Sequence, residues 1–153
     1  MSVRVDVQYA CEREGTPTAA EITTWVSAAL DGHPGGELTV RLVAEEEGRQ
    51  LNADYRGGTA PTNVLAFPFD APPGAEVELL GDVVVCRDVV AREALAQGKP
   101  PLHHWAHLVV HGVLHLIGFD HENDDNAKPM EDEERRILAA LGIPDPYSTE
   151  RVE

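Results

Sequence analysis

The segment from Pro101 to Ile117 places the strongest constraint on how this chain can fold. It is the longest apolar stretch with helical spacing, and Gly118 can end the helix in a left-handed conformation. No apolar run reaches the roughly 18 residues that a membrane span needs. A helix that is apolar on so much of its surface must be covered by other elements, so we expect it at the centre of the domain.

The rest of the chain alternates strand-like and helix-like patterns. The periodicity predicts strands at Val3–Val7, Leu38–Val43, Val64–Phe67 and Val83–Val85, and further helices at Ile22–Leu30, Glu45–Tyr55, Asp88–Gln97 and Met130–Leu141. No linker divides these elements. We therefore predict one α+β domain over residues 1–153, with about four strands, about five helices and an acidic tail from about residue 145.

Several local signals predict where individual elements lie. Thr18 and Glu21 fit a capping box at a helix start. Prolines on both sides of Val64–Phe67 suit an edge strand, whereas the continuous apolar run Val83–Val85 suits an inner one.

Large side chains are also assigned from the spacing. Trp25 and Trp105 lie in apolar helical rows, which favours core packing over stacking on nucleobases, and Cys86 is expected in the core as well. Leu51 and Tyr55 are expected on the inner face of their helix.

Charge and cysteine content limit the partners and the compartment. Twelve Lys and Arg face 27 Asp and Glu, a net charge of −15, which disfavours non-specific contact with DNA, RNA or an anionic membrane but leaves room for a local basic cleft. Two cysteines cannot form a disulfide framework, and the N-terminus lacks the apolar region of a signal peptide. We expect a cytoplasmic protein.

Histidines gather around the end of the central helix. His111 and His115 are four residues apart, so both imidazoles leave one helix face. On their own they would more often be buried, hydrogen-bonded core histidines. Gly118 can turn the chain back so that His121 supplies a third nitrogen. Three neutral histidines suit Zn²⁺ and leave a coordination position open for water, as in catalytic zinc sites.

The neighbours of this motif refine the chemistry. The spacing is that of the metzincin zinc proteases, but Gly112 stands where those enzymes carry their general-base Glu, which weighs against a peptidase. His103 and His107 continue the histidine row, where packing or support of a ligand is expected before ligation. His104 faces another direction and is expected to be exposed.

Separated motifs resemble the YbeY family of bacterial endoribonucleases and rRNA maturation factors. The resemblance runs from about Val3 to Tyr147. It rests on the segments His107–His121, Leu51-Asn52 with Tyr55–Gly57, Pro61–Leu65 with Phe67-Pro68, Gly81–Val85, and Met130 with Glu134 and Ile137-Leu138.

The resemblance implies a compact α+β fold with a zinc-hydrolase-like centre. It implies one Zn²⁺ per chain held by His111, His115 and His121, and Arg56 as a cationic catalytic or RNA-binding residue. The implied function is single-strand-specific endoribonuclease activity in 16S rRNA 3′-end maturation and in ribosome quality control. The implied partners are rRNA, the ribosome or small-subunit proteins.

The residues leave the reaction path and two other functions open. The ion could activate a water or polarise a phosphate oxygen, with Arg56 clamping the phosphate. Asp120 and Glu122 could orient His121, and no general base is evident. A metallopeptidase would use the edge strand Val64–Phe67 to pair with a peptide. A non-catalytic ribosome assembly factor would hold its metal for structure alone.

Overall fold

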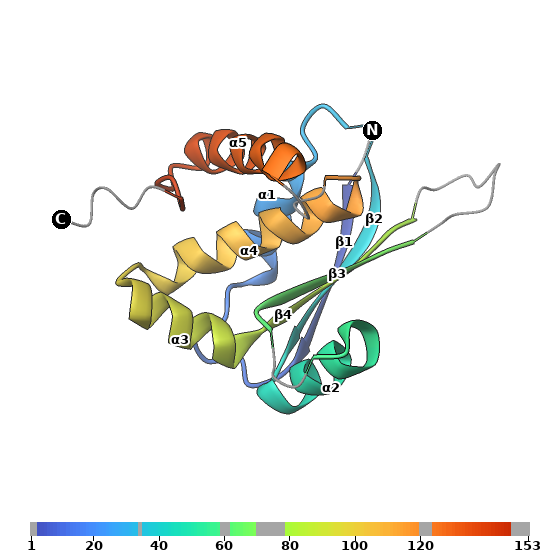
Figure 1. Cartoon of the computed structure of the whole chain (residues 1–153), viewed down its shortest axis with the longest axis vertical. Helices are drawn as coiled ribbons and strands as arrows, with labels where there is room; N and C mark the ends of the chain where they lie inside the picture. Colours follow the sequence, from blue (N-terminus) through green and yellow to red (C-terminus); the bar gives the residue numbers. More distant parts are fainter. Residues whose placement is uncertain (1–2, 34, 59–61, 70–78, 120–123, 148–153) are drawn as a thin grey trace.

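A mixed sheet and the helices that cover it form the α+β fold that the sequence predicted (Figure 1). The computed structural model describes residues 3–33, 35–58, 62–69, 79–119 and 124–147. Within these ranges there are four strands and five helices, in the order β1 (Val3–Ala10), α1 (Ala19–Ala29), β2 (Gly36–Val43), α2 (Glu45–Arg56), β3 (Val64–Pro68), β4 (Leu79–Cys86), α3 (Arg87–Gln97), α4 (Pro101–Leu116) and α5 (Asp124–Ala140).

The sheet has the strand order β1-β2-β4-β3. β1 and β4 both pair with β2 in parallel, whereas β3 pairs with β4 in antiparallel fashion. The predicted edge position of Val64–Phe67 and the inner position of Val83–Val85 are therefore confirmed. The edge strand β3 matters most for function, because its outer side has no strand neighbour among the described residues.

Helices cover the two faces of the sheet unequally. α1, α4 and α5 pack together on one face, and α2 lies on the other (Figure 1). The larger core fills the first layer and includes Trp25 and Trp105, as predicted. A smaller cluster, which includes Cys86, lies on the α2 side. Thr18 and Glu21 form the predicted capping box at the start of α1.

α4 is the central helix, as its apolar sequence predicted. It contacts β3, β4, α1, α3 and α5. A Cβ atom placed on Gly112 would lie 2.6 Å from Cγ1 of Val83, so α4 rests directly on β4 at this point. A larger side chain at position 112 would push the helix away from the sheet. None of the described helices is long and apolar enough to cross a membrane.

Tyr55 departs from the prediction. We expected its side chain on the inner face of the helix, but it is 67% exposed. Leu51, one turn earlier, does pack against the smaller cluster as predicted. The last turn of α2 lies beside Phe67 of β3, which is the edge strand of the sheet that the described residues form.

Candidate active site

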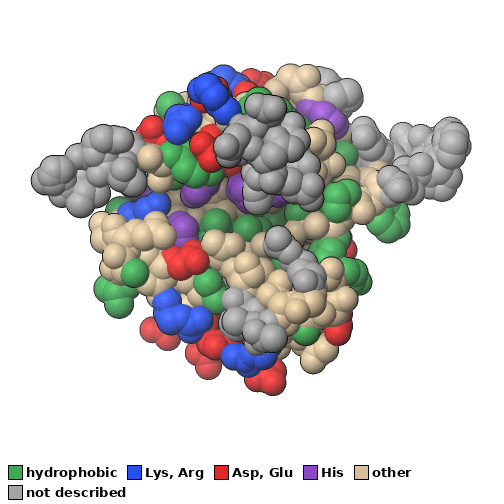
Figure 2. Space-filling model, viewed as in Figure 1, with side chains coloured by type: hydrophobic (Ala, Val, Ile, Leu, Met, Phe, Trp, Pro, Cys, Tyr) green, Lys and Arg blue, Asp and Glu red, His purple; other side chains and the backbone are tan. Residues whose placement is uncertain are grey.

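Three histidines form a row along one face of α4. The ring centroids of His107 and His111 are 6.2 Å apart, and those of His111 and His115 are 4.8 Å apart. Figure 2 shows histidine side chains along a hollow in this face of the molecule. The helical spacing therefore brings His111 and His115 together, as the sequence predicted.

A buried carboxylate from α5 anchors this row. Glu134 is completely buried. One of its oxygens, Oε1, lies 2.9 Å from Nε2 of His107 and also accepts a hydrogen bond from the Tyr147 hydroxyl. The other oxygen, Oε2, lies 2.5 Å from Nδ1 of His111. Both oxygens of the buried carboxylate are therefore hydrogen-bonded, which a group without access to water requires.

These contacts determine the charge state of Glu134. Burial raises the pKa of its carboxyl group, but the hydrogen bonds from His107 and His111 outweigh burial and lower that pKa to about 2. The group is thus a carboxylate at neutral pH and accepts hydrogen bonds from its neighbours. An Nδ1–H of His111 that donates to Glu134 leaves the lone pair of this imidazole on Nε2.

Tyr147 completes the cluster from the segment after α5. Burial and the neighbouring Glu134 raise the pKa of the Tyr147 phenol, so the phenol stays protonated and donates to the carboxylate. Its backbone N–H donates to Oδ1 of Asp145 at 2.8 Å, and Arg135 of α5 binds both oxygens of Asp145 at 3.2 Å. The ion pair thereby ties the segment that carries Tyr147 to α5.

The cluster opens on a groove of about 960 Å³. The groove lies between α4, α5 and the edge strand β3. Its described lining includes His111, His115, Glu134 and Tyr147 on one side, and β3 and Tyr55 on the other. A groove of this size can take an extended chain, and His111 and His115 would face that chain.

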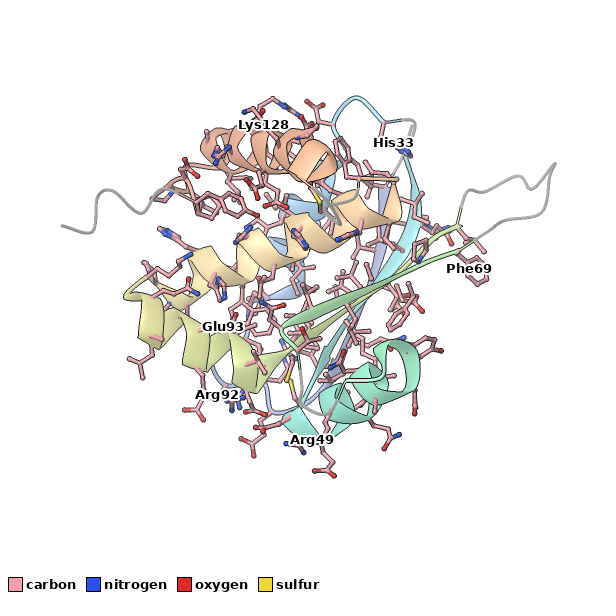
Figure 3. All side chains as sticks on the ribbon, in the orientation of Figure 1. His33, Arg49, Phe69, Arg92, Glu93 and Lys128 are labelled. Atoms are coloured by element: carbon pink, nitrogen blue, oxygen red, sulfur yellow. The ribbon has the colours of Figure 1, made fainter. Side chains whose placement is uncertain are left out.

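A second histidine–carboxylate cluster lies nearer the start of α4. Glu93 of α3 is labelled in Figure 3. Its Oε1 accepts a hydrogen bond from Nδ2 of Asn63 at 3.0 Å and lies 2.8 Å from Nε2 of His104. We expected His104 to be exposed, but only 4% of it is. That prediction was wrong because α3 packs over this side of α4. Burial lowers the pKa of His104, despite the opposing hydrogen bond with Glu93.

The structure describes the remaining predicted site residues only in part. Arg56 is the last residue of α2, and its side chain is outside the described part. His121, with its neighbours Asp120 and Glu122, lies outside the described residues. Gly118 has the positive φ of 108° that the predicted turn after α4 requires.

Among the described residues, one group could hold a metal ion: His107, His111 and Glu134. Their ligand atoms lie within 4.8 Å of one another. Imidazole nitrogens and a carboxylate oxygen are donors that suit a divalent ion such as Zn²⁺. Among the residues described here, the donor chemistry therefore fits a metal at this end of the groove.

The sequence reasoning missed the roles of Glu134 and Tyr147. One signal was present for Glu134, because this acid shares the apolar row of α5 with Met130, Ile137 and Leu138, all of them buried. An acid at a core position needs buried donors, and the histidine row of α4 supplies them. Tyr147 had no comparable signal, because it follows the last predicted helix.

Known proteins resemble this chain over most of its length. The family model "Endoribonuclease YbeY" matches residues 8–142. A protein described as endoribonuclease YbeY from Halorhodospira halophila is 58% identical over 135 residues, which cover 86% of this chain and 88% of the relative. One from Alkalilimnicola ehrlichii, with the same description, is 59% identical over 149 residues, which cover 94% and 90%.

The fold is similar to a solved structure as well. The solution structure of TM1509 from Thermotoga maritima matches with a TM-score of 0.60 and 25% identity, and the match covers 93% of this chain and 99% of that one. Fold, donor cluster and groove define an α+β hydrolase with a group of residues that could hold a metal ion. The chain belongs to the endoribonuclease YbeY family, a class of enzymes that hydrolyse phosphodiester bonds.

Proposed function

We propose that this chain is a zinc-dependent endoribonuclease that cleaves single-stranded RNA in the cytoplasm. Its role is the maturation of the 16S rRNA 3′ end and ribosome quality control, with the ribosome or small-subunit proteins directing it to its substrate. The whole of residues 1–153 serves as one catalytic domain. The observation that carries the proposal is the pair His111 and His115 on α4, in a chain of this family: both line the groove, and the buried Glu134 holds the ring of His111.

His111, His115 and His121 hold the zinc ion in this proposal. Two features support His111 and His115: both line the groove, and Nδ1 of His111 faces Glu134, so the neutral ring carries its lone pair on Nε2. Glu134 then orients a ligand instead of binding the ion, because its oxygens already accept from His107, His111 and Tyr147. His107 supports the cluster through the same carboxylate.

The zinc ion supplies a Lewis acid, which can activate a water or polarise a phosphate oxygen. Arg56 neutralises the phosphate, since a guanidinium keeps its charge at all physiological pH values and can bind two phosphate oxygens at once. Its place at the end of α2, next to groove-lining Tyr55, supports this role. Glu134 holds the proton of His111 on Nδ1 throughout.

The close packing at Gly112 speaks against the metallopeptidase alternative. A peptidase of the metzincin type would carry its general-base Glu at this position. The 2.6 Å distance from a Cβ on Gly112 to Cγ1 of Val83 leaves no space for that side chain. The edge strand β3 alone therefore does not make the groove a peptidase site.

The proposal is tested by cleavage of an end-labelled 16S rRNA 3′ fragment. Zinc-loaded wild type is compared with Arg56→Ala purified in the same way, so that a contaminating nuclease would appear in both. Arg49→Ala is the matched control, because Arg49 lies on the same helix and forms exposed ion pairs with Glu45 and Glu46.

We expect wild type and Arg49→Ala to cut the fragment, and Arg56→Ala to lose most of the activity. Equal cutting by Arg56→Ala would remove Arg56 from the mechanism. Absence of cutting by the wild type, on the free fragment and on small subunits alike, would favour the non-catalytic assembly factor.

A further inference from the structure

Tyr55 is a large aromatic residue left exposed at the rim of the groove. Its ring centroid lies 4.5 Å from that of Phe67, at an interplanar angle of 56°. Phe67 is half-buried in the smaller core cluster, so it provides a fixed support for the Tyr55 ring. An aromatic ring with 67% exposure and a rigid neighbour is arranged to receive a flat ligand.

The groove connects this ring with the histidine row. Tyr55 lines it together with His111 and His115, and so does the edge strand β3, which carries Phe67. A strand of nucleic acid with its phosphate at the histidines would therefore cross β3 and bring a neighbouring nucleotide to Tyr55.

The charges of the groove favour stacking over phosphate contacts at this point. Among the described lining residues there is no Lys or Arg, and Glu131 and Glu134 contribute carboxylates. The whole chain carries a net charge of −15. Arg56 and the zinc ion are the cationic groups of the proposed site, so further affinity for a polyanion needs contacts that do not depend on charge. Stacking of a nucleobase on an aromatic ring is such a contact.

We propose that Tyr55, supported by Phe67, is a subsite that stacks one unpaired nucleobase of the RNA in the groove. The inference rests on the proposed ribonuclease function and deepens it. It gives a physical reason for single-strand specificity, because a base within a duplex has both faces covered by its neighbours and cannot stack on a protein side chain.

The test is binding of a fluorescein-labelled, unstructured 12-nucleotide RNA to the zinc-loaded protein, followed by anisotropy over a range of salt concentrations. A denaturing gel confirms that the RNA stays intact during each measurement. The variants are Tyr55→Leu, which removes the ring, and Tyr55→Trp, which keeps an aromatic surface. Phe69→Leu is the matched control, since Phe69 is 58% exposed but does not line this groove (Figure 3).

We expect Tyr55→Leu to weaken binding about 5- to 150-fold, the equivalent of the usual 1–3 kcal/mol for one stacked base. Tyr55→Trp and Phe69→Leu should bind like wild type. The slope of log K against log [salt] should be the same in Tyr55→Leu and wild type, because no phosphate contact is lost. Loss of a phosphate contact would instead reduce that slope by about 0.7.

Two results would overturn the inference while the ribonuclease proposal stands. One is cleavage and binding by Tyr55→Leu at wild-type levels. The other is weaker binding with a reduced salt slope, or with equal weakening for a duplex of the same length, because either would point to a charge effect or a folding defect. A wild type that neither binds nor cuts RNA, but captures an extended peptide along β3, would overturn both proposals.

Discussion

Two histidine–carboxylate clusters lie on the same helix, and they differ in what surrounds them. Near the start of α4, His104 pairs with Glu93, whose side chain is 35% exposed. Further along, His107 and His111 share Glu134, which is completely buried. The first cluster joins α3 to α4 through a hydrogen bond, whereas His111 and Glu134 of the second line the groove.

A buried acid orients its surroundings through the hydrogen-bond donors that it requires. Glu93 keeps part of its hydration, so it needs few protein donors. Glu134 is completely buried and has no hydration, and three hydrogen-bond donors converge on it. Their convergence fixes the ring of His111 beside the groove. The same residue types therefore stabilise packing in one place and form a group that could hold a metal ion in the other, and the second group lies at the groove.

The largest expected effect concerns stability at low pH. The folded protein holds the pKa of Glu134 at about 2, below the ordinary 4.5. A lowered acid pKa stabilises the fold above pH 4.5, and this stabilisation is lost as the pH falls from 4.5 towards 2. The lowered pKa of this one carboxyl group contributes about 3 kcal/mol to the free energy of unfolding at neutral pH. Urea unfolding of wild type and Glu134→Gln at pH 6 and pH 3 measures it. The two proteins should differ much less at pH 3, and an unchanged difference would contradict the assignment.

The second expected effect is a difference in zinc affinity between a variant of each cluster. Glu134→Gln replaces an acceptor of His111 by an amide, and such changes beside a metal ligand lower affinity about 10- to 100-fold. Glu93→Gln, the matched control, should leave zinc affinity at the wild-type value. Competition with a colorimetric chelator measures both. Equal losses in the two variants would erase the distinction between the clusters.

The third effect concerns the Tyr147 hydroxyl. Tyr147→Phe keeps the ring beside His107 but removes one donor to a charged, buried acceptor, so we expect a loss of about 1.5 kcal/mol in the free energy of unfolding. Tyr9→Phe is the control, because the Tyr9 hydroxyl donates to the neutral carbonyl of Pro17. Chemical denaturation should show the smaller loss for Tyr9→Phe, and the reverse order would argue against the role of Tyr147.

The smallest effect belongs to the first cluster. Burial lowers the pKa of His104 below its ordinary 6.5, so the folded protein keeps this ring neutral. The unfolded chain takes up a proton first as the pH falls, and stability is therefore lost as the pH drops below 6.5. His104→Asn should reduce this loss between pH 7 and pH 5, as thermal melts can follow. A steeper loss in the variant would contradict the sign.

Local sequence patterns were sufficient for most of the fold. Apolar periodicity predicted the helices and strands, and the prolines around Val64–Phe67 predicted an edge strand, because both signals depend on neighbouring residues alone. The same helical spacing brought His111 and His115 together. α5 begins at Asp124, before the predicted Met130, since its first turn has no apolar row to reveal it.

What could not be predicted depended on packing between distant segments. His104 was misplaced because nothing near it in the sequence shows that α3 covers this side of α4. Tyr55 follows the inward spacing of α2, but the sheet ends at β3 and leaves the ring uncovered. Glu134 and Tyr147 join the site only through contacts made in the folded chain.

The most direct test of the account is a zinc titration of the protein followed by ¹⁵N NMR of its histidine side chains. We predict that the ¹⁵N signals of Nε2 of His111 and of a ring nitrogen of His115 shift on zinc binding, while Nδ1 of His111 keeps its proton and His107 keeps its bond to Glu134. Shifts at His107 and His111 with none at His115 would contradict it, and would place the ion between those two rings and Glu134 instead.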